Sequence, residues 1–143
     1  MKMTRSRGLE QLDVLVGEWS MKSKKFSEGN GRQTVEQIEG GAFLRLQTRE
    51  EDERFPASTQ VIGADESSDE CTCVYHDSRG VSRVYRMTLI DGVWKMWRDA
   101  PGFNQRYIGK ISADGRTISG SWEFSEDGKN WSVDFDLTYT KTS

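Results

Sequence analysis

Three segments of the chain carry arginine, tyrosine or glutamine at alternate positions, a spacing that can build an anion-binding site. The residues are Arg83, Tyr85, Met87 and Leu89 in the first segment, Trp94, Met96 and Arg98 in the second, and Gln105 and Tyr107 in the third. Alternate residues of an extended strand share one face. If these faces point inward, guanidinium and phenol groups meet inside an apolar cavity. A buried guanidinium requires a partner, and a ligand carboxylate or phosphate supplies one through charge-assisted hydrogen bonds.

These positions are the predicted ligand-binding residues. The polar grip is predicted to consist of Arg83, Arg98, Tyr85 and Tyr107, and the apolar wall of Met87, Trp94 and Met96. Two alternatives stay open at this point. A shifted strand register exposes the arginines to solvent, or they pair with internal aspartate or glutamate. Arg45 and Arg106 are weaker candidates, since their neighbours do not fix the face on which they lie.

No catalytic set is evident, so no catalytic residue is assigned. His76 stands beside Asp77 and Ser78, but adjacent residues in a strand or turn do not converge on one point. Cys73 lies three positions before His76 and is expected on the opposite face. One histidine and two cysteines also lack the spacing of a zinc site. We therefore predict no metal and no cofactor.

Short alternating segments must position these residues. After a short amphipathic helix over residues 8–16, about ten strands follow, joined by Gly and Asp turns. Asp91-Gly92 is a typical two-residue hairpin turn. In the last segment, Trp131, Val133, Phe135, Leu137 and Tyr139 are expected on one dry face. The pattern predicts an all-β, up-and-down antiparallel barrel over residues 17–141, within one domain over residues 1–143. A barrel of this size is wide enough to hold a small ligand.

Two further features of the chain are assigned structural roles. Trp19 follows Gly17, whose conformational freedom lets the chain turn from helix into strand, and the indole is expected to fill the closed end of the barrel. Cys71 and Cys73 lie two apart in one strand, so they point the same way and do not bridge readily. We interpret them as reduced, packed thiols.

Composition narrows the class of partner and compartment. The chain has 143 residues with 20 basic and 23 acidic side chains interspersed, and a net charge of −3. The absence of a basic patch argues against nucleic-acid binding. No apolar run approaches the roughly 20 residues of a membrane span. The basic start runs into Glu10 and Asp13 rather than an apolar core, unlike a secretory signal. A cytoplasmic protein without a membrane partner is the expectation.

Several motifs resemble a known family. Gly17-Glu18-Trp19 resembles the G-x-W that opens the first strand of lipocalins and other calycins. The opening Leu15–Trp19, the turn Glu39–Gly41, the stretch Trp97–Phe103 and the ending Trp131–Tyr139 resemble the DUF1579 group of bacterial proteins over nearly the whole chain. The resemblance implies a lipocalin-like barrel of mostly uncharacterised function.

Two more distant barrel families sharpen this expectation. Nitrobindins hold haem through a histidine in a C-terminal strand, whereas the last strand here has no histidine and His76 lies mid-chain. Fatty-acid-binding barrels grip an acid head with arginines and a tyrosine. The resemblance therefore favours a fatty-acid-like grip over haem binding.

Three functional hypotheses follow. The first is a binding module for a small apolar or amphipathic ligand, anionic where the arginines hold it. The second is an enzyme acting on a small lipid-like substrate, for which His76, Glu123 and Glu36 are the groups to test. The third is a homodimeric interaction protein whose barrel is filled by its own side chains, with Trp97 marking the interface because large aromatics are enriched there.

Overall fold

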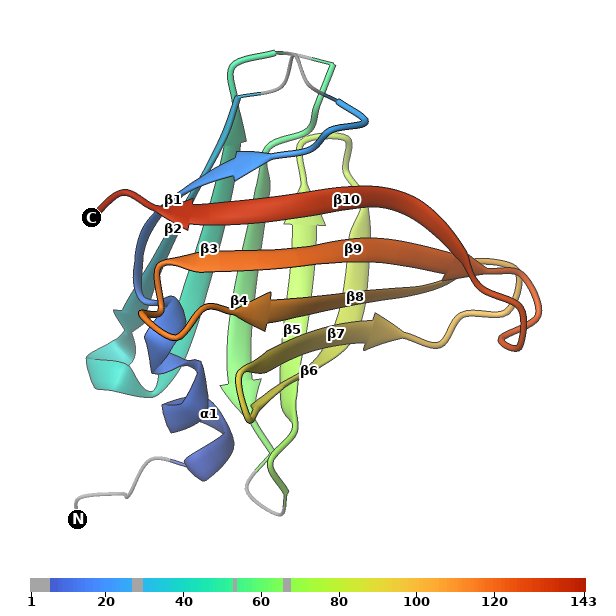
Figure 1. Cartoon of the computed structure of the whole chain (residues 1–143). Coiled ribbons are helices and arrows are strands. Elements are labelled where there is room, and N and C mark those ends of the chain that lie inside the picture. The colour runs from blue at the N-terminus through green and yellow to red at the C-terminus, as the bar shows by residue number, and fades with distance from the viewer. Residues whose placement is uncertain (1–5, 27–29, 53, 66–67) are drawn as a thin grey trace.

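The ten strands form one closed antiparallel barrel in which each strand pairs with its sequence neighbours and β1 pairs with β10. The structure is a computed structural model and describes residues 6–26, 30–52, 54–65 and 68–143. Figure 1 shows the strands curling around a common axis with α1 across one end. The strands are β1 Gly17–Lys22, β2 Gly31–Ile38, β3 Phe43–Glu50, β4 Ser58–Ala64, β5 Cys71–Asp77, β6 Ser82–Ile90, β7 Val93–Arg98, β8 Asn104–Ile111, β9 Thr117–Ser125 and β10 Ser132–Lys141. The predicted all-β barrel of about ten strands is confirmed.

The predicted short N-terminal helix over residues 8–16 is present one residue earlier, and it is divided into two parts. It consists of α1, Arg7–Gln11, followed by the 3₁₀ helix η1, Leu12–Leu15. The three buried leucines Leu9, Leu12 and Leu15 recur every third residue. That spacing aligns side chains on a 3₁₀ helix, where residues i and i+3 eclipse. The leucine spacing therefore explains why the second turn tightens as it packs onto the barrel.

The helix closes one end of the barrel. Ser6 caps α1 by accepting a hydrogen bond from the Gly8 amide, and α1 contacts β4 and β6. Trp19 packs beneath it with 1 % of its surface exposed, and its indole Nε1 donates to Leu15 O at 2.8 Å. Gly17 adopts a φ of 137°, a region that L side chains rarely adopt. The predicted structural roles of Trp19 and Gly17 are both present at this closed end.

The β10 strand contains the one clear departure from the expected alternation. A β-bulge between Val133 and Phe135 makes Asp134 an extra residue in the β9–β10 ladder. A bulge changes which face the preceding residues present. Val133 is therefore 64 % exposed, and Trp131 packs on the Arg106 guanidinium, 4.0 Å from its ring centroid. The expectation that Trp131 and Val133 share the dry face with Phe135, Leu137 and Tyr139 was wrong for these two residues.

A second short 3₁₀ turn, η2, Glu39–Gly41, joins β2 to β3 at the helix end of the barrel. In an up-and-down barrel, alternate connections lie at opposite ends. The links before β2, β4, β6, β8 and β10 therefore gather at the end away from α1. None of the helices in the described part of the chain has the length and apolar run needed to cross a membrane.

Candidate functional site

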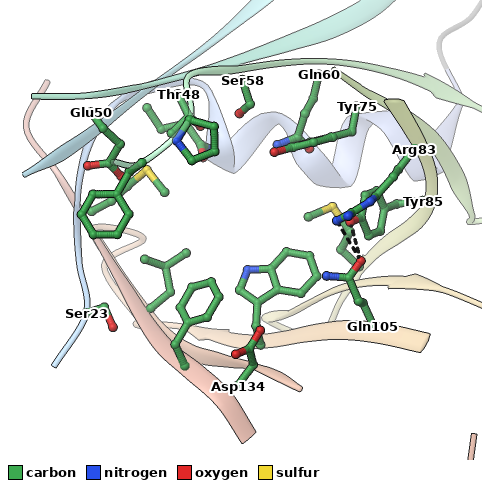
Figure 2. A pocket seen from close by; sticks show the side chains of 18 of the residues that line it. Ser23, Thr48, Glu50, Ser58, Gln60, Tyr75, Arg83, Tyr85, Gln105 and Asp134 are labelled. Atoms are coloured by element: carbon green, nitrogen blue, oxygen red, sulfur yellow. Dashed lines mark hydrogen bonds between the residues drawn. The ribbon is translucent and has the colours of Figure 1, made fainter. Parts of the chain in front are cut away.

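A cavity of about 420 Å³ occupies the barrel interior and extends to the end away from α1. That volume falls within the roughly 300–1,000 Å³ of small-molecule sites. Its outermost lining residues come from the connections at that end, and two of them, Phe26 and Phe103, are 38 % and 42 % exposed. We call this end the mouth. Figure 2 looks into the cavity and shows polar side chains around its wall.

The deeper wall is apolar and aromatic, with a few polar groups. Trp94 and Met96 come from β7, Leu137 and Tyr139 from β10, and Trp122 from β9. The Trp94 and Tyr139 rings are tilted by 58° with their centroids 5.4 Å apart, a separation typical of favourable aromatic pairs. This wall suits the hydrocarbon part of a ligand.

Two glutamines interrupt the apolar wall. Gln33 on β2 is 3 % exposed and Gln60 on β4 is 7 % exposed, and both line the cavity. The Gln60 Oε1 accepts a hydrogen bond from the buried Cys73 thiol at 3.0 Å. A glutamine amide carries two donors as well as its acceptor. Gln60 therefore retains donors that an oxygen-bearing ligand can use.

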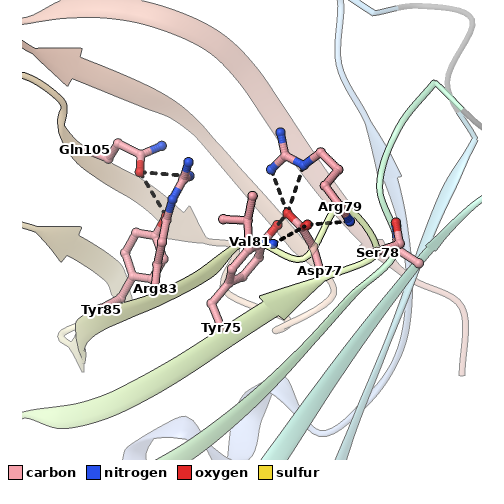
Figure 3. Close-up of polar contacts among 9 residues, drawn as sticks. Tyr75, Asp77, Ser78, Arg79, Val81, Arg83, Tyr85 and Gln105 are labelled. Atoms are coloured by element: carbon pink, nitrogen blue, oxygen red, sulfur yellow. Dashed lines mark hydrogen bonds and ion pairs between the residues drawn. The ribbon is translucent and has the colours of Figure 1, made fainter.

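Arg83 and Tyr85 converge on one neutral group near the mouth. Arg83 is the second residue of β6, and Tyr85 follows two residues later on the same face. The Gln105 Oε1 accepts from the Tyr85 hydroxyl at 2.9 Å and from Arg83 Nη1 at 3.3 Å, as Figure 3 shows. Burial raises the pKa of Tyr85, partly offset by the hydrogen bond from Arg83. The phenol is therefore a neutral donor beside a cation.

The second mouth arginine, Arg79, is already neutralised. Its Nη2 lies 2.6 Å from Oδ2 of Asp77, whose side chain is fully buried. The same Oδ2 accepts from the Tyr75 hydroxyl at 2.8 Å, and Oδ1 accepts from the Arg79 amide at 2.9 Å (Figure 3). The hydrogen bonds from Arg79 are the main reason that the pKa of Asp77 lies far below its usual range. This cluster holds the β5–β6 turn and supports one side of the mouth.

Arg83 differs from Arg79 in having no carboxylate partner among the described residues. Within that part of the chain its guanidinium contacts neutral groups. It donates to the Gln105 oxygen, and its central carbon lies 5.7 Å from the centroid of the Phe103 ring. The alternative that an inward arginine pairs with an internal acid is therefore not seen for Arg83 within the described residues. Arg79, which the sequence analysis did not single out, makes such a pair with Asp77.

Two carboxylates face the cavity, and sequence reasoning missed both. Glu50 ends β3 and Asp134 is the extra residue of the β10 bulge. Asp134 lies 3.6 Å from Lys25 Nζ. Burial, and then the charge of Asp52, raise the pKa of Glu50. The alternation Leu44, Leu46, Thr48, Glu50 carried a signal for Glu50. Nothing in the sequence pattern marked the bulge that turns Asp134 inward.

Four of the seven predicted ligand-binding residues line the cavity: Arg83, Tyr85, Trp94 and Met96. The other three lie elsewhere. Met87 is 0 % exposed and Tyr107 is 1 % exposed within the core, and the Tyr107 hydroxyl donates to Leu137 O at 3.1 Å. Arg98 ends β7 half-buried, outside the cavity lining. The polar cluster that the structure forms near the mouth therefore consists of Arg83, Tyr85 and Gln105.

The remaining candidates lie outside the cavity lining. Arg45 pairs with Glu36 across β2 and β3. Arg106 pairs with Glu123 at 2.7 Å across β8 and β9. His76 is exposed on β5. The three groups named for an enzyme, His76, Glu123 and Glu36, thus lie outside the cavity lining.

Cys71 and Cys73 are free and buried, as expected. Burial raises the pKa of Cys71 to about 11 and of Cys73 to about 12. The thiolate is the nucleophilic form of cysteine, so these thiols are suited to packing. No cluster of three or more metal-ligating side chains occurs within the described residues.

Comparison with known proteins supports the fold. No family model matches the chain, and no curated protein matches it. Among solved structures, the crystal structure of Rv2717c from M. tuberculosis is similar, with a TM-score of 0.66 and 13 % sequence identity. The match covers 98 % of this chain and all of that one. At this identity the likeness establishes the ten-stranded barrel as a shared fold.

Proposed function

We propose that the protein binds a small amphipathic molecule inside the barrel and holds its acidic head with Arg83, Tyr85 and Gln105. One observation carries the proposal. Arg83 lines the cavity without a carboxylate partner among the described residues, while its contacts are to neutral groups. Arg83 is partly withdrawn from water, where a counter-charge is worth more than in open solvent, and a ligand carboxylate or phosphate supplies one through bidentate hydrogen bonds.

The surroundings of Arg83 support an amphipathic rather than a wholly polar ligand. The Tyr85 hydroxyl is next to the same Gln105 oxygen, so a second donor is available to an anion that displaces it. Beyond these groups the wall consists largely of Met96, Trp94, Leu137 and Tyr139. A hydrocarbon tail would bury its surface there at roughly 25 cal/mol for each Å² removed from water.

Membership of the DUF1579 family and a cytoplasmic location form part of this proposal. The motifs from Leu15 to Tyr139 support the first, and the shared barrel fold is consistent with it. The two free cysteines support the second, because thiols persist in reducing compartments. The cavity also favours a container over a barrel filled by its own side chains.

The test is calorimetric binding of dodecanoic acid and of dodecanol to the protein and to Arg83→Met. We expect the acid to bind, and Arg83→Met to weaken it by about 10- to 100-fold, the range of a charged hydrogen bond. The alcohol should bind Arg83→Met and the native protein equally. Arg106→Met is the matched control, because this arginine pairs with Glu123 outside the cavity. Equal losses in both variants, or no binding of the acid, would overturn the proposal.

A further inference from the structure

The cavity lining holds four charged side chains, and the contacts of each decide which remain without a counter-charge. They are Arg79, Arg83, Glu50 and Asp134. Arg79 pairs with Asp77, and Asp134 pairs with Lys25. Neither Arg83 nor Glu50 has an ion-pair partner among the described residues. The lining therefore presents one unpaired cation and one unpaired carboxyl group.

Glu50 is a partly buried residue whose carboxyl group has an unmet hydrogen-bonding capacity. Its Oε2 is enclosed and has no hydrogen-bond partner in the described structure. The carboxyl group sits over Gly31, where an added Cβ would come within 2.5 Å of Oε1 and 3.1 Å of Met21 Cβ. Burial raises the pKa of Glu50, with a contribution from Asp52. An enclosed carboxyl without a donor loses the hydrogen bonds that it makes in water.

Glu50 and Arg83 also lie across the cavity from one another. Glu50 ends β3 and Arg83 is the second residue of β6, with β4 and β5 between the two strands. Both positions are at the mouth end of their strands. Figure 2 shows the two side chains on opposite sides of the opening, with Thr48, Ser58 and Gln60 between them along the wall. Glu50 and Arg83 do not form an ion pair with each other, because two strands separate them in the barrel wall. Both side chains nevertheless line the same cavity.

We propose that the ligand is amphoteric, with an acid that binds Arg83 and an ammonium or other N–H donor group that binds Glu50 across the mouth of the cavity. This inference rests on the proposed function, because it assigns the second end of the same ligand. An ω-amino acid has this chemistry. It supplies a counter-charge to both groups at once, whereas a simple fatty acid leaves Glu50 as it is.

A preference for the ω-amino acid over the methyl-ended acid can be recognised in binding measurements, because it is the opposite of what the hydrophobic effect alone predicts. Replacing a terminal methyl group by ammonium normally weakens binding to an apolar cavity, since a charge must leave water. A protein that binds the amino acid more tightly than the methyl-ended acid must supply a counter-charge at that end. Glu50 is the lining group able to do so, as Asp134 already has Lys25.

The experiment measures binding of a series of straight-chain ω-amino acids of increasing length, each beside the unsubstituted acid of equal length. We expect one length to bind about tenfold more tightly than its unsubstituted partner, consistent with one charged hydrogen bond. Glu50→Gln should abolish this preference and leave the unsubstituted acid unchanged. Glu50→Asp, which withdraws the carboxyl by one carbon, should reduce the preference or move it to a longer chain. Thermal unfolding of each variant verifies that it is folded.

Glu36→Gln is the matched control, since this carboxylate pairs with Arg45 on the outer face. The outcomes separate the two proposals. If the unsubstituted acid binds more tightly at every length and Glu50→Gln changes neither ligand, the amphoteric assignment is overturned and the acid grip stands. If no acid or amino acid binds at any length, the proposed function fails and this inference with it.

Discussion

Gly31 on β2 lies directly opposite Glu50 on β3, and a Cβ added to Gly31 would come within 2.5 Å of Glu50 Oε1. The absence of a side chain at Gly31 thus makes the space into which the Glu50 carboxyl folds. The position of the Glu50 carboxyl group is therefore determined by the space over Gly31 on the neighbouring strand rather than by a hydrogen bond. This relationship gives a way to move Glu50 without replacing it.

Gly31→Ala should displace the Glu50 carboxyl group from its position over residue 31 while keeping its charge. The flexible end of the Glu50 side chain is the atom group that must shift, so the fold should persist with a stability change within about 1 kcal/mol. We expect the variant to lose the preference for the ω-amino acid and to keep its affinity for the unsubstituted acid. Calorimetry with both ligands checks this. An unchanged preference for the ω-amino acid would show that binding does not depend on the position of the Glu50 carboxyl group over Gly31.

Glu50 should make the native protein less stable as pH rises. Its folded-state pKa is raised above the ordinary value of 4.5, mainly by burial, so the fold disfavours the ionised form. The folded state then binds more protons than the unfolded state above about pH 4.5, and stability falls with rising pH until the folded-state pKa is passed. Glu50→Gln removes this loss. Urea unfolding should show equal stabilities near pH 4 and a more stable variant near pH 8; a variant that is less stable at pH 8 would contradict it.

Asp77 should act in the opposite sense. Hydrogen bonds from Arg79 are the main cause of its lowered pKa, so its stabilising effect is complete above the ordinary value of 3.8 and is lost as pH falls below it. Asp77→Asn should cost about 1–3 kcal/mol near neutral pH, because hydrogen bonds to a buried charged group are weakened. It should also flatten the acid limb of the stability curve. Asp91→Asn, at an exposed turn with φ of 53° that asparagine tolerates, is the control and should change neither.

Cys71 and Cys73 should resist alkylation in the folded protein. Their pKa values of about 11 and about 12 leave little thiolate near neutral pH, and both side chains are buried. Iodoacetamide at about pH 8 should label them at the rate of unfolding, and fully in urea. Mass spectrometry over time measures the rate. Labelling of either cysteine as fast as a free thiol would show that it is accessible in the native state.

The buried leucines of α1 and η1, Leu9, Leu12 and Leu15, should contribute most of the stability of the closed end. Leu12 is 0 % exposed, and Leu12→Ala should destabilise the protein by about 2–5 kcal/mol through lost burial and a residual cavity. Val133→Ala is the control. Val133 is 64 % exposed beside the bulge, so its loss should change stability by no more than about 0.5 kcal/mol. A large effect at Val133 would contradict the outward placement.

Strand alternation was sufficient to predict the barrel and four of the residues that line its cavity. Because side chains alternate strictly along β6 and β7, the shared face of Arg83 and Tyr85 and that of Trp94 and Met96 followed from their spacing alone. How far a side chain lies from the mouth does not follow from alternation. Met87 therefore shares a face with Arg83 but is part of the core.

The sequence pattern did not predict which ion pairs form or where a β-bulge occurs. Arg79 was not identified as a cavity residue, because it lies in a turn where strand alternation gives no face. Its Asp77 partner accepts hydrogen bonds from the Arg79 amide and side chain through the geometry of that turn. Arg106 and Glu123 are paired by a register between β8 and β9 that no local signal sets. Asp134 entered the cavity through an extra residue that leaves the composition of β10 unchanged.

Because Asp134 is an extra residue in β10, its carboxylate can be removed from the mouth without changing the rest of the strand. Val133 pairs with Glu123 and Phe135 with Trp122, while Asp134 has no partner across the ladder. Excising Asp134 alone would give an unbroken ladder with Val133 still outside and Phe135 still inside. The chain thus carries this carboxylate as an insertion of one residue, which can be gained or lost without redrawing the rest of the strand.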